Sequence, residues 1–140
     1  MTRKEFSNQL VKSREEANCG KNELCRRTGF TFQQLQRLEN ASNNFSIDNV
    51  IKYLDAIEYD LFITKDKKML LFDNRESFAN HFKILRNECD LSQRDFANKV
   101  GLSYSVIAGI EYGNKNTAID NILLCLEGLG CQIIIKKKNE

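Results

Sequence analysis

The sequence predicts a mainly α-helical protein made of two similar units, each of which ends in a short β-strand. Residues 14–41 and 86–113 align without a gap at an offset of 72 residues, and the apolar positions stay in register over about 60 positions. A β-rich apolar run follows the last helix of each copy, which favours joining the two runs in one small antiparallel sheet. Identical residues at this offset include Phe6/Phe78, Arg14/Arg86, Glu16/Glu88, Gly29/Gly101, Glu39/Glu111 and Asn44/Asn116.

The repeat also sets the expected domain boundary. The first unit covers residues 1–72 and the second covers residues 73–140, with a short linker at about residues 73–75. The chain has no proline to mark a linker, so this boundary rests on the repeat alone.

Each unit is expected to begin with three helices. The first carries apolar residues three and four positions apart, such as Phe78 and Phe82, which is the spacing of one buried helix face. The second begins near Lys21 or Gln93 and ends before Gly29 or Gly101, where a tight turn favours positive φ. Two hydroxyl residues suit the N-cap of the third helix, which runs to about Asn40 or Tyr112: Thr31 and Ser103.

A fourth helix and a strand complete each unit. The fourth helices begin at Ile47 and Ile119 after polar loops, and the strands are expected at Tyr59–Thr64 and Cys131–Lys136. Met69–Phe72 is a second apolar run after Lys65-Asp66-Lys67, which indicates a hairpin partner for the first strand.

Composition narrows the function classes. The net charge of +2 is too small to indicate a nucleic-acid partner by itself. Five cysteines without CxxC spacing indicate neither a disulfide framework nor a zinc site, and we expect no metal or cofactor. No apolar run approaches the roughly 18 residues of a membrane span, so we expect a cytoplasmic protein without a membrane partner. No nucleophile–base set is visible, and we expect no enzymatic activity.

The second helix, the turn glycine and the third helix together resemble a known DNA-binding motif. The segment LSQRDFANKVGLSYSVIAGIEYGNKN, residues 91–116, is similar to the phage-repressor (Cro-like, xenobiotic-response-element) helix-turn-helix family. The resemblance extends over about residues 6–58 and 78–130, so it implies two tandem lambda-repressor-like units. The first copy departs from the pattern, with Cys-Gly-Lys at residues 19–21 where Leu-Ser-Gln is common.

The resemblance implies that the third helix of each unit lies in the DNA major groove. The second, third and seventh residues from its cap would then face the bases. These are Phe32, Gln33 and Arg37 in the first copy, and Tyr104, Ser105 and Gly109 in the second. Phosphate contacts are expected at the start of the second helix and in the loop after the third, from Lys21, Asn40, Asn43, Asn44, Gln93, Lys115 and Asn116.

The two copies differ in reading capacity. Gln33 can pair with adenine and Arg37 with guanine, whereas Gly109 has no side chain and Ser105 offers one hydroxyl. We therefore expect the first copy to be the principal reader of sequence.

A recurring arginine and glutamate have a structural interpretation. In the family an arginine that ends the first helix pairs with a glutamate near the end of the third. This pattern assigns Arg14 to Glu39 and Arg86 to Glu111, as partly buried ion pairs that fix the helix packing.

Three functions follow from these observations. The leading one is a sequence-specific, repressor-like transcriptional regulator that binds double-stranded DNA. The second is an antitoxin that represses its own operon and binds a toxin protein. The third is a protein-interaction module whose helix-turn-helix no longer reads DNA. A second copy of the chain is also kept as a partner, through strand pairing between chains.

Overall fold

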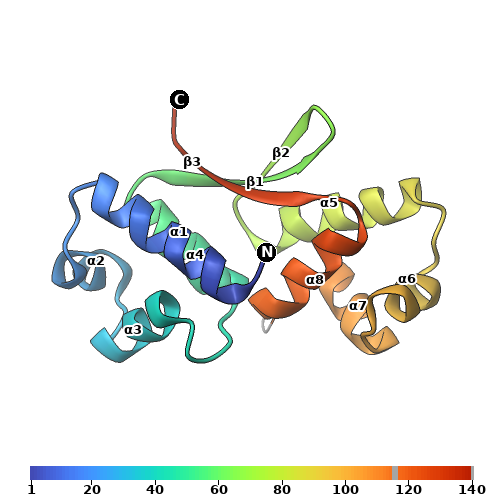
Figure 1. Cartoon of the computed structure of the whole chain (residues 1–140), viewed down its shortest axis with the longest axis horizontal. Helices are drawn as coiled ribbons and strands as arrows, with labels where there is room; N and C mark the ends of the chain where they lie inside the picture. Colours follow the sequence, from blue (N-terminus) through green and yellow to red (C-terminus); the bar gives the residue numbers. More distant parts are fainter. Residues whose placement is uncertain (115–116, 140) are drawn as a thin grey trace.

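The computed structural model describes residues 1–114 and 117–139, which form eight helices and three strands. The helices of the first half and the hairpin that follows them are α1 (Arg3–Glu16), α2 (Lys21–Thr28), α3 (Phe32–Asn40), α4 (Ile47–Ala56), β1 (Tyr59–Lys65) and β2 (Lys68–Phe72). The second half consists of α5 (Arg75–Glu88), α6 (Gln93–Val100), α7 (Tyr104–Tyr112), α8 (Ile119–Gly128) and β3 (Gln132–Lys137). The two groups of helices lie side by side beneath one sheet (Figure 1).

The helix boundaries repeat along the chain. Each helix from α5 to α8 begins and ends 72 residues after its counterpart among α1 to α4, as Arg3 and Arg75 illustrate. The expected boundary between residues 72 and 73 falls in the short connection from β2 to α5. The division into two helix-turn-helix units, residues 1–72 and 73–140, stays a prediction.

Local sequence explains where the third helices begin. Thr31 Oγ1 accepts a hydrogen bond from the Gln34 amide at 3.1 Å, and the Gln34 side chain accepts one from the Thr31 amide at 2.8 Å. This reciprocal cap satisfies two amides at the start of α3 that have no partner within the helix. The turns that precede α3 and α7 use Gly29 at φ +79° and Gly101 at φ +77°, a backbone conformation that favours glycine.

The three strands form one antiparallel sheet in the order β2-β1-β3. The expected small sheet is therefore confirmed, although β3 begins at Gln132 rather than at Cys131. Phe62 pairs with Ile134, which is the same position of the repeat, and Leu61 and Ile63 pair with Ile135 and Ile133. A strand pair centred on equivalent residues relates the two halves by a pseudo-two-fold axis.

A second backbone contact lies on the same axis. Ser46 and Ala118, which precede α4 and α8, form an isolated antiparallel bridge. The Ile47 amide donates to the Thr117 carbonyl at 3.0 Å, and the Ile119 amide donates to the Phe45 carbonyl at 2.8 Å. The pseudo-two-fold axis of the sheet therefore also relates the starts of α4 and α8.

Symmetrical ion pairs join the halves as well. Arg3 Nη1 lies 3.3 Å from Asp120 Oδ2, and Arg75 Nε lies 2.9 Å from Asp48 Oδ1, at equivalent repeat positions. The buried apolar side chains of both halves form one continuous core. None of the helices in the described ranges is both long and apolar enough to cross a membrane.

Asn44 has a contact across this junction that its sequence position did not indicate. Its Oδ1 accepts hydrogen bonds from the Phe45 amide at 3.0 Å and from the Asp120 amide at 3.3 Å. Ala118, the N-cap residue of α8, has no side-chain oxygen, whereas Ser46 caps α4 itself. Asn44 of the first half therefore supplies part of the cap of α8.

We expect Asn44→Ala to destabilise the fold by about 1 kcal/mol, the usual cost of removing a helix cap. Urea unfolding followed by circular dichroism measures the change. Asn43→Ala is the matched control, because Asn43 is exposed in the same loop. Equal stability of the two variants would show that the contact from Asn44 to α8 contributes nothing.

Candidate nucleic-acid interface

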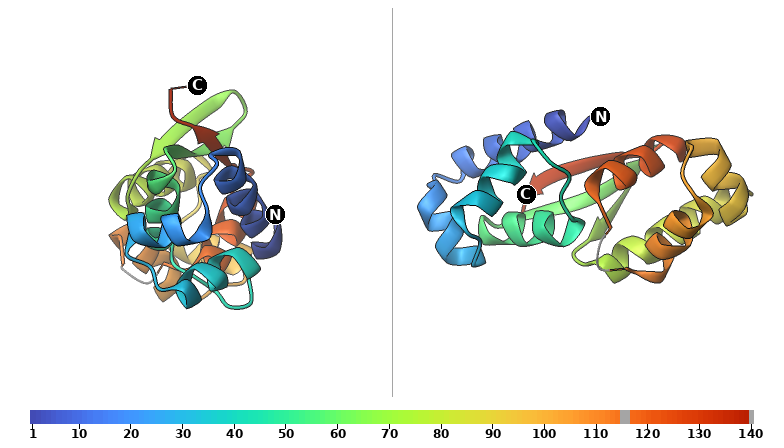
Figure 2. Two further views of the ribbon diagram at one scale, coloured as in Figure 1. Left: turned by 90° about the vertical axis from the view of Figure 1, so that its left-hand side faces the viewer. Right: turned by 90° about the horizontal axis from the view of Figure 1, so that it is seen from below.

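The third helices of the two halves share one side of the molecule. α3 and α7 lie on the side opposite the sheet, one in each half (Figure 1). Seen from below, the two helix groups lie on either side of the central strands (Figure 2, right). Both helices therefore face away from the sheet on the same side of the molecule.

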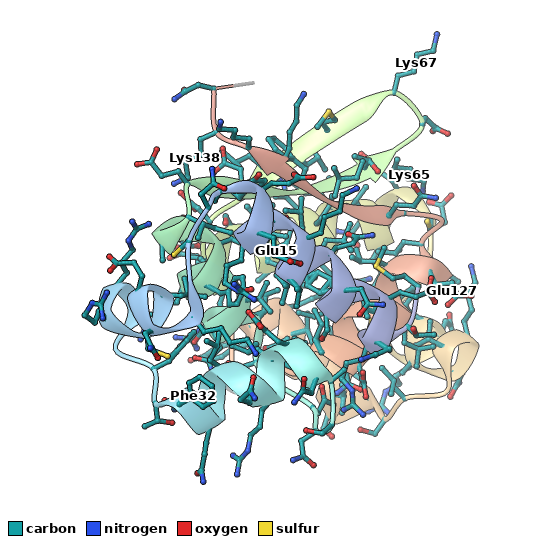
Figure 3. All side chains as sticks on the ribbon, turned by 60° about the vertical axis from the view of Figure 1, so that its left-hand side comes forward. Glu15, Phe32, Lys65, Lys67, Glu127 and Lys138 are labelled. Atoms are coloured by element: carbon teal, nitrogen blue, oxygen red, sulfur yellow. The ribbon has the colours of Figure 1, made fainter. Side chains whose placement is uncertain are left out.

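α3 presents the residues that were expected to read bases in the first half. Phe32 is 49% exposed and projects away from the hairpin that carries Lys67 (Figure 3). Gln33 and Arg37 are exposed on the same helix, one turn apart. Within the described residues Arg37 makes no ion pair, so its guanidinium is available to a ligand.

Lys21 extends this surface from the start of α2. Its Nζ donates to Gln36 Oε1 at 3.1 Å and lies 5.9 Å from the centre of the Phe32 ring. The sequence placed Lys21 among the phosphate contacts but did not single out Gln36. The packing of α2 on α3 is what brings the ammonium group beside the predicted reading positions.

α7 presents a different surface in the second half. Tyr104 is 43% exposed, and the guanidinium carbon of Arg94 lies 4.3 Å from the centre of its ring. Ser105 is exposed and its hydroxyl lies 3.1 Å from that of Ser103. Sequence reasoning missed Arg94, because only the packing of α6 against α7 reveals its cation–π contact with Tyr104.

Gly109 lies against the side chain of Asn114 in the loop after α7. A Cβ atom at this position would lie 2.5 Å from the Asn114 side-chain nitrogen. The backbone N–H of Asn114 also donates a hydrogen bond to the Gly109 carbonyl at 3.0 Å. The absence of a side chain at position 109 leaves room for the Asn114 side chain, which would have to shift to admit a larger residue.

The predicted phosphate contacts have different surroundings. Asn40 and Asn43 are exposed, and Asn44 uses its side-chain oxygen to cap α8. The Gln93 amide group donates to Glu111 Oε1 at 3.0 Å, which orients Gln93 at the start of α6. Lys115 and Asn116 lie outside the described residues. The DNA contacts of all these residues stay predictions.

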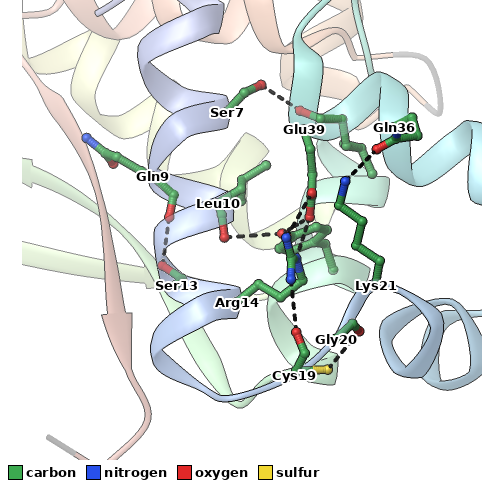
Figure 4. A network of polar contacts seen from close by, with 12 residues as sticks. Ser7, Gln9, Leu10, Ser13, Arg14, Cys19, Gly20, Lys21, Gln36 and Glu39 are labelled. Carbon is green, nitrogen blue, oxygen red and sulfur yellow. Dashed lines mark hydrogen bonds and ion pairs between the residues drawn. The ribbon is translucent and has the colours of Figure 1, made fainter.

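A buried ion pair joins α3 to α1 (Figure 4). Arg14 Nε and Nη2 donate to the two carboxylate oxygens of Glu39 at 2.7 and 3.1 Å, and Nη1 donates to the Cys19 carbonyl at 3.0 Å. The Tyr53 hydroxyl donates to Glu39 Oε2 at 2.6 Å, and burial raises its pKa, so it remains a donor. The Glu39 side chain is 3% exposed, and these contacts satisfy both of its oxygens.

In the second half, different residues supply the hydrogen bonds to the equivalent glutamate, Glu111. Arg86 contacts both carboxylate oxygens of Glu111 and donates from Nη1 to the Leu91 carbonyl at 2.6 Å. Gln93 supplies the additional hydrogen bond that Tyr53 gives to Glu39. Cys125 stands at the repeat position of Tyr53, and burial raises its pKa to about 12.

Comparison with known proteins agrees with this geometry in the second half. Residues 82–135 match the family model described as helix-turn-helix, which takes in α6, the turn at Gly101, α7 and α8. Residues 1–72 lie outside the match. No curated protein and no solved structure is significantly similar to the chain.

We expect Arg14→Ala to lower the free energy of unfolding by about 3–5 kcal/mol, because Glu39 would remain buried without its counter-charge. Thermal and urea unfolding measure this loss. Arg26→Ala is the control, since Arg26 is 69% exposed and pairs with Glu23 on the surface, where a pair is worth at most about 1 kcal/mol.

Any loss of DNA affinity in Arg14→Ala should follow the unfolded fraction. If the variant keeps full stability but loses DNA affinity, Arg14 takes part in DNA binding and not only in the packing of the helices.

We also expect Cys125 to resist alkylation in the folded chain. A thiol with a pKa of about 12 holds only about one part in 10⁴ as the reactive thiolate at pH 8. Iodoacetamide at pH 8, read by peptide mass spectrometry, should modify the partly buried Cys25 and Cys89 first. Rapid labelling of Cys125 under native conditions would contradict its burial.

Proposed function

We propose that this protein is a sequence-specific, DNA-binding transcriptional regulator of repressor type. The helix-turn-helix match over residues 82–135 carries the proposal, since proteins of this class place the helix equivalent to α7 in the major groove. Support for a second reader comes from α2, Gly29 and α3. These have the same helix boundaries at an offset of 72 residues and lie on the same side of the molecule.

In this proposal the chain holds two tandem helix-turn-helix units, residues 1–72 and 73–140. Dimeric regulators with this motif bind two half-sites whose symmetry mirrors that of the protein. Here the pseudo-two-fold axis through the β1–β3 pair and the Ser46–Ala118 bridge provides the same relation within one chain. One chain, with its two units, would then occupy a whole operator.

The operator is proposed to have unequal half-sites. Gln33 and Arg37 are long, polar and exposed on α3, whereas the equivalent positions on α7 carry Ser105 and Gly109. Because Gly109 has no side chain, the proposed base contacts of α7 are the exposed Tyr104 and Ser105 in its first turn. The first unit is therefore the principal reader, and the second unit mainly positions the chain.

Phosphate contacts supply the part of the affinity that does not depend on sequence. Lys21 is suited to this role because its ammonium group lies at the start of α2, next to Phe32. Arg94 is added to the proposed contacts, since it lies beside Tyr104, the counterpart of Phe32, although the repeat position of Lys21 is Gln93.

Selection of bound sequences from a random DNA pool tests the function. The proposal expects a bipartite site with one strongly and one weakly specified half. Recovery of no preferred sequence would contradict it and would favour a protein-interaction module with a degenerate helix-turn-helix.

A prediction follows for Arg37. Arg37→Ala should cost about 1–3 kcal/mol on the selected site and relax the preference at one base pair. Ser105→Ala should cost less than Gln33→Ala, because one hydroxyl discriminates bases less well than a bidentate amide. Fluorescence anisotropy on a panel of single-base operator variants measures both effects.

Lys21→Ala should behave differently from Arg37→Ala. It should weaken binding to all sequences and reduce the salt dependence of the affinity, since a phosphate contact releases counterions without reading bases. Lys67→Ala removes the same charge at the hairpin, away from α3 (Figure 3), and should change little. If Arg37→Ala shows the uniform loss expected of Lys21→Ala, the first unit is not the principal reader.

A further inference from the structure

β3 forms one edge of the sheet and lies along a groove. Among the described residues no strand pairs with its outer edge, so alternate residues of β3 direct their N–H and C=O groups away from β1. The groove has a volume of about 800 Å³ and is lined by α1, α8 and β3, including Lys12, Leu123, Leu126 and Ile133. An open strand edge beside a groove is a template for another strand.

The pseudo-two-fold axis shows what fills the equivalent place in the other half. There β2 pairs with the outer edge of β1, with Phe72 opposite Leu61 and Leu70 opposite Ile63. Phe72 is 1% exposed, and the centre of its ring lies 5.1 Å from that of Phe78 on α5.

The two sites can be compared residue by residue. Ile51, Leu54 and Leu61 line a cavity of only about 10 Å³ beside Phe72. Their repeat partners, Leu123, Leu126 and Ile133, line the groove of about 800 Å³ beside β3. The two cavities are lined by equivalent positions of the repeat, and β2 covers only one of them.

We propose that the edge of β3 binds an extended segment of a partner protein by β-strand addition. The segment runs antiparallel to β3, as β2 runs to β1, and pairs with Ile133–Lys137 over about five residues. Its apolar side chains lie opposite Ile133 and Ile135, where the equivalent residues of β2 are Phe72 and Leu70. Backbone hydrogen bonds supply the pairing, and the alternate apolar side chains supply the selectivity.

A second copy of the chain is a poorer occupant. Its own β3 would present Ile133 and Ile135 at the inward positions, but these already pack against the core of their own molecule. The inward residues of its β2, Leu70 and Phe72, are engaged in the same way. A segment from another protein brings free apolar side chains.

The proposed partner leaves the DNA-facing side open. The sheet lies on the opposite side of the molecule from α3 and α7 (Figure 1), and α1 and α8 lie beneath β3. Binding at the edge of β3 is therefore independent of the proposed DNA function, and each can fail without the other.

The test uses the full chain without DNA and a peptide of residues 67–74, KKMLLFDN, as a stand-in for the partner segment. Hydrogen–deuterium exchange should show protection of β3 amides when the peptide is added, with β1 amides unchanged. A peptide with serine in place of Leu70 and Phe72 should bind about tenfold more weakly or worse, since these side chains enter the groove. The control peptide carries serine in place of Met69 and Leu71, which face outward in β2, and should bind nearly as well as the parent.

Two variants of the chain test whether the peptide binds in the groove beside β3. Lys12→Trp puts a bulky ring on α1 in the groove, and should abolish the protection of β3. Ile84→Trp changes the equivalent position of α5, which is 55% exposed and lies outside the groove, and should have no effect.

Three results would overturn the proposal. The first is the absence of protection at peptide concentrations of about 1 mM, which corresponds to only about 4 kcal/mol of binding. The second is equal binding of the two serine-substituted peptides. The third is a dimer by sedimentation in which β3 is protected without peptide, because that result assigns the edge to a second copy.

Discussion

The antiparallel pairing of β1 with β3 sets how the two halves of the molecule lie relative to each other. It is centred on Phe62 and Ile134, which occupy the same position of the 72-residue repeat. Any strand pair centred on equivalent residues relates the attached halves by a two-fold rotation. The placement of α3 and α7 on one side of the molecule follows from this constraint, and the Ser46–Ala118 bridge repeats it beneath the sheet.

A repeat within one chain allows the two halves to differ where a symmetric dimer cannot. The buried carboxylate of Glu39 accepts a hydrogen bond from Tyr53, whereas that of Glu111 accepts one from Gln93. Ser46 caps its own helix, whereas α8 receives a hydrogen bond from Asn44 of the first half. The exposed side chains of α3 and α7 are a further difference between the two halves, and the proposed unequal operator follows from it.

Much of the fold could be predicted from the sequence because its signals are local or repeated. The turn glycines, the caps at Thr31 and Ser103 and the strand run Met69–Phe72 each depend on a few neighbouring residues. The joining of the two strand runs followed from their equivalent positions and from the unpaired backbone groups of a lone strand.

The surroundings of the candidate site were harder to predict, because they depend on contacts between distant segments. The cap from Asn44 to α8 spans 76 residues, and the Arg94–Tyr104 contact requires the packing of α6 on α7. Nothing in the sequence indicated that Gly109 lies against the Asn114 side chain. Identity of residue type at the repeat offset cannot reveal such contacts, since equivalent residues have different neighbours in the two halves.

In the proposed complex, one chain places α3 and α7 on one DNA duplex. Hydroxyl-radical footprinting of the full chain on its selected operator, combined with native mass spectrometry of the complex, measures both the protected segments and the number of chains bound. We expect one chain per duplex and two protected segments on the same face of the DNA, about 10 base pairs apart from centre to centre. A single protected segment bound by one chain, or two chains per duplex, would contradict it.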